Sequence, residues 1–355
     1  MTVQRWMIYG AYGYSGRLIA EHAKAKGLAP VLAGRDAAKT EALADALGFE
    51  SRCFALGDRA ALAAALEDID AVIHCAGPFS ATSKPMIDGC IDAGTHYFDI
   101  TGEAFVFEHA HSDVVSNAAA RADVIVCPGV GFDVVPTDCV AKALAEAMPD
   151  AVSLELAFAG GSRLSPGTAK TMVEGMGLGT WARRDGRLVR TGVLTREIDF
   201  GAGPRRAMSI SWGDISTAFH STGIPNITVY IPAAPKMISN AKRAQWIRPL
   251  FRLGVVQKYL KSRIDKKIKG PSDEQRATDV TRVWGEVADA GGKKLSARLT
   301  TANGYTVTQL APVAIIEHLM AHEAPSGSLT PALLMGKDFA SSLAGSSAIV
   351  IEEVI

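Results

Sequence analysis

Residues 7–16 read Met-Ile-Tyr-Gly-Ala-Tyr-Gly-Tyr-Ser-Gly, a short apolar run that ends in a turn with three glycines. Residues 17–26 follow directly and have the apolar spacing of a helix. This order predicts a strand, a glycine turn and a helix, and such a turn lets backbone N–H groups approach a pyrophosphate at the positive end of the helix dipole. A glycine triplet alone is weak evidence, so an ordinary loop is the alternative. The turn residues that we expect to contact a dinucleotide are Gly10, Tyr12, Gly13, Tyr14, Ser15 and Gly16.

The next apolar run, residues 28–33, ends in Gly34-Arg35-Asp36, at the place where a Rossmann fold reads the adenosine ribose. A carboxylate at the strand tip binds a free 2′-OH, whereas a guanidinium pairs with the oxygens of a 2′-phosphate. Because the tip is a glycine followed by Arg35, the sequence favours NADP(H) over NAD(H), with Lys39 as a second contact. The alternatives are that Asp36 turns back toward the ribose and that Arg35 is only a solvated charge.

Length and composition set the limits for the rest of the chain. The 355 residues are 48% apolar, and this length exceeds a single Rossmann unit. We therefore expect two domains, 1–150 and 151–355, with the last ~30 residues returning to the first. The formal net charge of zero argues against nucleic acid as the main partner.

The five cysteines are scattered and mostly lie in apolar runs, so we expect buried thiols and neither a metal site nor a disulfide framework. The first strand begins almost at once, which leaves no room for a signal peptide. No apolar run approaches the ~20 residues of a membrane span. These features predict a cytoplasmic protein.

Strand-like and helix-like patterns alternate through residue ~150, which is typical of a doubly wound parallel sheet. The predicted strands end at Tyr9, Ala33, Phe54, Ala76, Ile100 and Val126. The predicted helices cover 37–47, 59–66, 83–93 and 105–121.

In such a sheet ligands bind beyond the carboxyl ends of the strands. The residues there that we expect to line a nicotinamide pocket are Cys75, Ala76, Gly77, Pro78, Phe79, Thr101, Gly102, Gly129 and Gly131, with the acids Glu103 and Asp133 beside them. Loop punctuation and helix capping are the alternatives for any one of these segments.

Taken together, the glycine turn, Ala-Gly-Arg-Asp at 33–36, Cys-Ala-Gly-Pro-Phe at 75–79, Tyr-Phe-Asp-Ile-Thr-Gly-Glu at 97–103 and Pro-Gly-Val-Gly-Phe-Asp at 128–133 resemble the saccharopine dehydrogenase-like oxidoreductases. The chain is similar in particular to the branch with bacterial trans-acting enoyl reductases. Tyr12 departs from that branch, which usually carries threonine there.

The likeness continues through 167–169, 270–272, 283–287 and 329–336, so it covers most of the chain. It implies a Rossmann domain, a second α+β domain with a mixed sheet, an NADP(H) cofactor and hydride transfer. It does not identify the substrate.

The second domain has a different pattern. Residues 152–159 and 226–232 are expected as strands, and 281–288 with 295–301 as a hairpin around Asp289-Ala-Gly-Gly292. One face of such a sheet is available to a substrate or to another subunit, and we expect a homodimer.

Residues 236–269 contain eleven Lys or Arg and one acid, Asp265. Apolar residues recur there at three and four positions, so an amphipathic helix would carry a basic face that suits an anionic membrane surface. The alternative is a surface helix packed on the core, interrupted at Pro249 and Gly254. The apolar positions are Trp246, Leu250, Leu253, Val256, Leu260, Ile264 and Ile268.

Hydride transfer is usually accompanied by a proton donor. The Tyr-x-x-x-Lys pair of short-chain dehydrogenases is absent from the sequence. His220 is the main candidate because imidazole titrates near neutral pH, and a packed structural histidine is the alternative. The further candidates are Asp133, Glu103, Lys170 and Tyr305.

Three functions remain open. The first is an NADPH-dependent reductase of an apolar, enoyl-type substrate, supported by the resemblance and by the apolar stretch 172–181. The second is an oxidoreductase acting on C–N bonds of amino-acid conjugates. The third is a non-catalytic NADP(H)-binding protein. The arginines that could bind substrate carboxylates in the second case are Arg163, Arg183, Arg184, Arg187 and Arg190.

Overall fold

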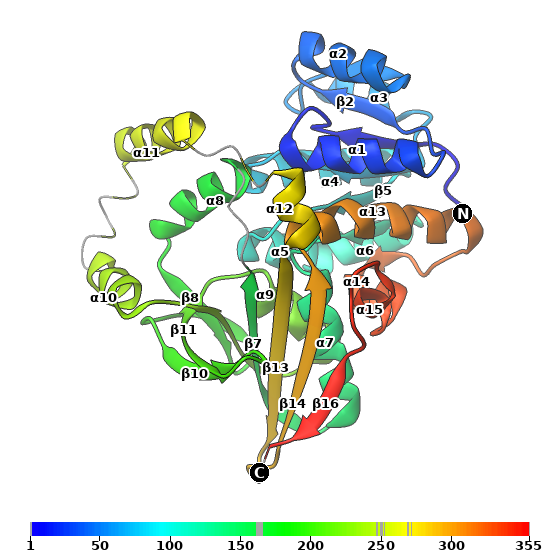
Figure 1. Cartoon of the computed structure of the whole chain (residues 1–355). Coiled ribbons are helices and arrows are strands. Elements are labelled where there is room, and N and C mark those ends of the chain that lie inside the picture. Colours follow the sequence, from blue (N-terminus) through cyan, green and yellow to red (C-terminus); the bar gives the residue numbers. More distant parts are fainter. Residues whose placement is uncertain are drawn as a thin grey trace. The chain divides into compact units, whose positions relative to one another are not determined.

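The computed structural model describes residues 2–160, 166–245, 248, 251, 253–267, 270 and 272–354 (Figure 1). The chain divides into two compact units, each made of two segments that are distant in the sequence. Unit 1 is Met1–Val135 with Tyr305–Gly336, and unit 2 is Pro136–Gly304 with Lys337–Ile355. The sequence-based boundary at residue 150 stays a prediction, because compactness alone does not show which segments fold independently.

Unit 1 contains a parallel sheet in the order β15-β6-β5-β4-β1-β2-β3. Every neighbouring pair in it is parallel, which confirms the predicted doubly wound sheet. The order reverses between β1 and β4, and a crevice for ligands lies at such a switch point. The strands are β1 (Trp6–Tyr9), β2 (Val31–Gly34), β3 (Ser51–Cys53), β4 (Ala71–His74), β5 (His96–Asp99), β6 (Ile125–Cys127) and β15 (Gly327–Ser328).

All residues of β1, β2, β4 and β5 are buried, as expected for parallel strands covered by helices on both faces. One predicted helix, 105–121, is in fact two, because Ser112 caps a new helix by accepting a hydrogen bond from Val115 N. The helices of unit 1 are α1 (Tyr14–Ala25), α2 (Ala37–Leu47), α3 (Arg59–Leu66), α4 (Phe79–Ala93), α5 (Ala104–Ala110), α6 (Asp113–Arg121), α13 (Gly304–Ala321) and α14 (Pro331–Met335).

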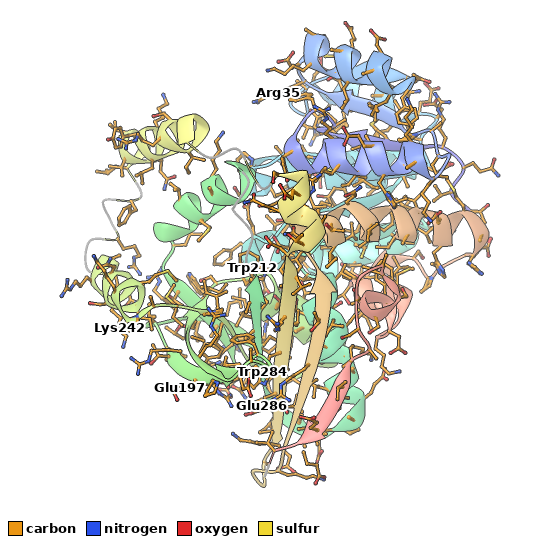
Figure 2. All side chains as sticks on the ribbon, in the orientation of Figure 1. Arg35, Glu197, Trp212, Lys242, Trp284 and Glu286 are labelled. Atoms are coloured by element: carbon orange, nitrogen blue, oxygen red, sulfur yellow. The ribbon has the colours of Figure 1, made fainter. Side chains whose placement is uncertain are left out.

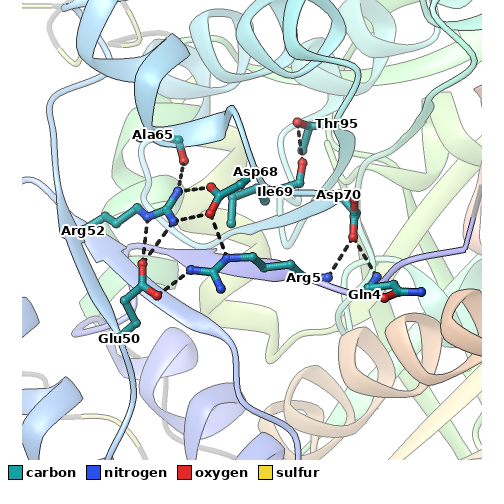
Figure 3. Close-up of polar contacts among 9 residues, drawn as sticks. All are labelled: Gln4, Arg5, Glu50, Arg52, Ala65, Asp68, Ile69, Asp70 and Thr95. Carbon is teal, nitrogen blue, oxygen red and sulfur yellow. Dashed lines mark hydrogen bonds and ion pairs between the residues drawn. The ribbon is translucent and has the colours of Figure 1, made fainter.

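A network of charges joins the strands at their amino ends (Figure 3). Arg52 donates two hydrogen bonds to Asp68, at 2.6 and 2.8 Å, and two to Glu50, at 3.0 and 3.1 Å. Arg5, just before β1, pairs with Asp68 at 3.1 Å and with Glu50 at 2.5 Å. The carboxylate of Asp70 accepts the backbone N–H groups of Gln4 and Arg5. These contacts connect β1, β3 and the loop before β4.

Unit 2 contains a mixed sheet in the order β10-β11-β12-β7-β13-β14-β16, with β8 paired to β12 and to β9. The β7 and β12 strands are parallel, whereas β13 and β14 form the predicted antiparallel hairpin. The predicted mixed sheet of the second domain is therefore confirmed. The strands are β7 (Ala151–Gly160), β8 (Thr180–Arg184), β9 (Arg187–Thr191), β10 (Thr195–Asp199), β11 (Pro204–Ile210), β12 (Asn226–Pro232), β13 (Val280–Asp289), β14 (Lys294–Ala302) and β16 (Val350–Glu353).

The described part of the basic segment 236–269 contains two helices, α10 (Pro235–Ala244) and α11 (Gly254–Lys267). Leu253 is exposed and Ile264 is buried, while Trp246, Leu250 and Ile268 of the predicted stripe lie outside the described residues. Across the described ranges, no helix is long and apolar enough to cross a membrane. The helices of unit 2 are α7 (Val135–Ala147), α8 (Pro166–Met176), α9 (Asp214–Thr222), α10 (Pro235–Ala244), α11 (Gly254–Lys267), α12 (Asp273–Thr278) and α15 (Phe339–Ser342).

Candidate functional site

The glycine turn after β1 packs directly on the segment that follows β4. Gly10 has φ +81°, and its N–H donates to Ala33 O at 2.7 Å. A Cβ added at Gly10 would lie 2.8 Å from Ala76 N, closer than real Cβ contacts allow. The turn thus requires glycine both for its backbone conformation and for the close approach of β1 and β4 at the switch point.

The other two glycines of the turn differ in what surrounds them. A Cβ on Gly16 would lie 2.5 Å from Gly10 O and 2.9 Å from Ala11 Cα, so Gly16 closes the turn against α1. A Cβ on Gly13 would have a single neighbour within 4 Å, Gly10 O at 3.2 Å. Gly13 is the N-cap of α1 and has no side chain to cover the N–H groups of the first helical turn. This end of α1 is therefore open to an anionic group.

Tyr14 and Ser15 are the first two residues of α1. The ring of Tyr14 meets the ring of Tyr305 edge to face, with centroids 5.1 Å apart. Tyr305 begins the second segment of unit 1, so this contact joins α13 to the start of α1.

At the tip of β2, the ring of Tyr12 occupies the space beside Gly34. A Cβ on Gly34 would lie 2.6 Å from Tyr12 Cε1, and the Lys39 ammonium lies 5.7 Å from the centre of the same ring. Asp36 caps α2, because its carboxylate accepts Lys39 N at 3.2 Å and Lys39 Nζ at 2.7 Å. These hydrogen bonds lower the pKa of Asp36. The carboxylate of Asp36 thus caps α2, while the side chain of Arg35 is exposed at the tip of β2 (Figure 2).

The segment after β4 starts α4 with a cap that comes from a distant residue. Phe79 N and Ser80 N donate to the two oxygens of Glu103, at 2.9 and 3.0 Å. Pro78 precedes the helix and supplies no side-chain cap, so Glu103 compensates the first N–H groups of α4. Burial raises the pKa of the Cys75 thiol and keeps it protonated at neutral pH.

Asp99, at the end of β5, connects the loops that follow β5 and β6. Its buried carboxylate accepts hydrogen bonds from Tyr97 OH at 2.6 Å, Thr101 N at 2.9 Å and Gly129 N at 2.8 Å. Burial raises its pKa to about 6 in spite of these donors. Asp99 is not among the site residues predicted from the sequence, although an acid at the tip of a buried strand is a usable signal.

The loops after β5 and β6 lie against each other. A Cβ on Gly102 would lie 2.8 Å from Asp133 Oδ2, which places that carboxylate over the Gly102 backbone. A Cβ on Gly129 would lie 2.6 Å from the ring of Phe107, and one on Gly131 would lie 3.0 Å from Thr308. Small residues in both loops therefore let acids and helices of unit 1 approach closely. In sum, the structure brings together the predicted residues Gly10 with Ala76, Phe79 with Glu103, and Gly102 with Asp133.

His220, the main candidate proton donor, belongs to unit 2. It lies exposed in the last turn of α9, with its ring 5.7 Å from that of Phe219. At the other end of α9, Asp214 is fully buried, and burial together with the nearby Asp138 charge raises its pKa to about 7. Lys170 lies in α8, also in unit 2.

Two of the arginines considered for substrate carboxylates are engaged in unit 2 itself. Arg183 is buried and donates to the backbone oxygens of Ile215 and Gly186, each at 2.7 Å. Arg184 donates to Thr228 Oγ1 at 2.9 Å. Arg163 lies outside the described residues.

The N-terminal part of the chain is similar to a known family. Residues 6–125 match the sequence profile of the saccharopine dehydrogenase NADP binding domain. Over these residues the chain is similar to the NADP-binding domains of that family. The open end of α1 and the basic tip of β2 fit a phosphorylated dinucleotide.

The curated relatives are proteins of mycobacteria. A Mycobacterium tuberculosis protein assigned by name to the trans-acting enoyl reductases is 33% identical over 183 residues, which cover 47% of this chain and 43% of that protein. A trans-acting enoyl reductase of Mycobacterium ulcerans is 30% identical over 139 residues, covering 37% of this chain and 33% of the relative. The chain thus spans less than half the length of these relatives in the matched regions.

Two solved structures share the whole fold. Saccharopine dehydrogenase (L-Glu forming) from Saccharomyces cerevisiae has a TM-score of 0.63 at 12% identity, covering 99% of this chain and 100% of that one. Homospermidine synthase from Legionella pneumophila, solved with NAD, has a TM-score of 0.62 at 13% identity, covering 99% of this chain and 91% of that one. At these identities the likeness shows the fold alone.

Proposed function

We propose that the chain is an NADPH-dependent oxidoreductase that reduces the C=C bond of an enoyl-type, lipid-like substrate. The observation that carries the cofactor part is the space over Gly13 at the open end of α1, since a side chain there would fill the place where a pyrophosphate binds. The enoyl part is supported by the names of the mycobacterial relatives. It is also supported by the absence of a Tyr-x-x-x-Lys pair.

The residues of unit 1 have distinct roles in this proposal. The first turn of α1 holds the pyrophosphate, and Arg35 pairs with the 2′-phosphate. When bound, NADPH supplies a hydride. Glu103 holds the first turn of α4 in place, and Asp99 fixes the loops after β5 and β6, so both act as positioning residues.

In the reduction, the β-carbon of the enoyl group gains a hydride and the α-carbon gains a proton, with an enolate between the two steps. The proton comes from His220 or from water. Asp133 remains a predicted catalytic residue that faces the reacting carbons. Glu103 was predicted as a catalytic residue too, and in the structure its carboxylate caps α4.

Stereospecifically deuterated NADPH tests the reaction. Incubation with unsaturated acyl thioesters should place deuterium at the β-carbon. A lower kcat of His220→Gln with an unchanged Kd for NADPH would assign the proton to His220, and an unchanged kcat would assign it to water. Deuterium transfer to imines of amino-acid conjugates alone would favour the C–N oxidoreductase. Binding of NADPH without turnover of either class would favour a non-catalytic NADP(H)-binding protein. Engagement of Arg183 and Arg184 within unit 2 weighs against the C–N alternative.

A further inference from the structure

Unit 2 contains a cleft of about 510 Å³ between α10 and the β10–β11 pair. The α10 residues that line it are spaced three, four, seven and eight positions after the first of them, so they form one face of the helix. The opposite wall comes from the two strands. The lining residues are Thr195, Arg196, Glu197, Arg206, Pro235, Ile238, Ser239, Lys242 and Arg243.

The charges in this cleft are unbalanced. Arg206, Lys242 and Arg243 make no ion pair with any side chain of the described ranges, and Glu197 is the one acid among the lining residues. Figure 2 shows Lys242 on α10 and Glu197 on β10, on the two walls of the cleft. The three cations and Glu197 leave a net positive charge, and an anion in the cleft would relieve the repulsion among like charges.

Arg196 differs from the other three cations because it is already neutralised. It pairs with Glu155 and, at 2.7 Å, with Glu286, and its guanidinium lies 4.8 Å from the ring centre of Trp284. Arg196 is therefore not available as a free anion-binding group. The available positive charge comes from Arg206, Lys242 and Arg243.

The chemistry of the lining also varies along α10. The cations Lys242 and Arg243 lie toward its C-terminal end, whereas Pro235 and Ile238 lie toward its start, with Ser239 between them. Guanidinium groups bind phosphate oxygens in pairs, and an ammonium adds a point charge. We propose that this cleft binds the phosphate of a phosphate ester and that the organic part of the ester lies on Pro235 and Ile238. The inference is independent of the proposed reaction.

Such a phosphate ester is either a soluble metabolite or the headgroup of a lipid. Two probes distinguish these two kinds of ligand. The soluble probe is hexyl phosphate, with hexanol as the uncharged control, measured by calorimetry. The membrane probe is sedimentation with vesicles of phosphatidylglycerol, with phosphatidylcholine vesicles as the control. Binding of hexyl phosphate assigns a soluble source, and binding to the anionic vesicles alone assigns the headgroup.

The test compares two double variants, one in the cleft and one outside it, and each removes two positive charges. Lys242→Gln with Arg243→Gln should weaken binding of the active probe about tenfold or more, as expected for loss of charge-assisted hydrogen bonds. Lys258→Gln with Arg263→Gln, on exposed positions of α11, removes the same charge outside the cleft and should change binding less than twofold. Glu197→Gln should tighten binding about two- to fivefold.

A variant that fills the cleft without altering charge completes the test. Ser239→Phe should weaken binding while circular dichroism remains unchanged. Equal losses in the α10 and α11 variants would show bulk charge attraction only and would overturn the proposal. It would also be overturned if the wild-type protein bound neither hexyl phosphate nor anionic vesicles.

Discussion

In the parallel sheet of unit 1, the side formed by the amino ends of the strands (the amino edge) and the side formed by their carboxyl ends (the carboxyl edge) are stabilised in different ways. At the amino edge, Arg5, Glu50, Arg52 and Asp68 are partly exposed and each charge has partners of opposite sign (Figure 3). At the carboxyl edge, Asp99 is fully buried and forms no ion pair with any described residue, and glycines stand where segments meet. The four charges described at the amino edge are paired with one another. At the carboxyl edge, the open end of α1 can bind a ligand. The comparison indicates that the amino edge contributes to stability and that the carboxyl edge is shaped for binding.

The largest expected effect comes from filling the space at the carboxyl edge. Gly13→Val should weaken NADPH binding more than a hundredfold, because the branched side chain occupies the place of the pyrophosphate. The melting temperature should fall only slightly, because the added Cβ makes a single tight contact, at 3.2 Å from Gly10 O. Calorimetric titration with NADPH and thermal unfolding measure the two effects.

Gly16→Val is the matched control, because its Cβ collides with the backbone of the turn itself and should lower the melting temperature as well as binding. If Gly13→Val retained NADPH binding, the turn would be wrongly assigned.

The second effect is a dependence of stability on pH at the carboxyl edge. Burial raises the pKa of Asp99 to about 6, above the unfolded value of about 4. Its stabilising contribution is therefore fully present below about pH 4 and is lost as the pH rises through about 6, by about 3 kcal/mol in all.

Asp99→Asn can keep the three hydrogen bonds, because the amide oxygen accepts from Thr101 N and Gly129 N and the NH₂ donates to Tyr97 OH. Urea unfolding between pH 4 and 7 should show a smaller loss of stability for this variant than for the wild type. Asp214 contributes with the same sign, so the difference between the two proteins is the relevant quantity. Identical slopes would contradict the raised pKa.

The third effect concerns cofactor choice at the tip of β2. Arg35→Ala should weaken NADPH about ten- to a hundredfold and leave NADH unchanged, because a charge-assisted pair with the 2′-phosphate contributes roughly 1.5–3 kcal/mol. Lys24→Ala, which removes an exposed cation in the last turn of α1, should change neither affinity. Equal affinities of the wild-type protein for the two cofactors would argue against the assignment of Arg35.

The smallest effect is expected at the amino edge. Hydrogen bonds from Arg52 lower the pKa of Asp68 to about 2, so its contribution is present above about pH 4 and is lost as the pH falls through about 2. Asp68→Asn should reduce the free energy of unfolding at neutral pH by about 1 kcal/mol or less, because the pair is largely exposed. The Kd for NADPH should stay the same. A large change in that Kd would show that the two edges are coupled.

The sequence predicted β1, β2, β4 and β6 well because each is fully buried and reads as a largely apolar run. It also predicted the glycine turn, since its chemistry is local. The cap of α4 by Glu103 and the role of Asp99 were not predicted, because both depend on contacts with residues 23 to 30 positions away.

In unit 2 the hairpin of β13 and β14 was predicted from its alternation and glycine turn, and the structure confirms it. The residue type of His220 suggested a proton donor, but its exposure on α9 reflects packing that no local pattern encodes. The split of 105–121 into α5 and α6 depends on a capping serine, a signal that was available at Ser112.

The contact between Tyr12 and Gly34 has a consequence for how cofactor preference can evolve. A carboxylate at position 34 would favour NAD(H), yet any side chain there collides with the Tyr12 ring 2.6 Å from the added Cβ. A carboxylate at position 34 therefore requires a smaller residue at position 12, such as threonine. Positions 12 and 34 are thus coupled, because the side chain at one decides what the other can accommodate.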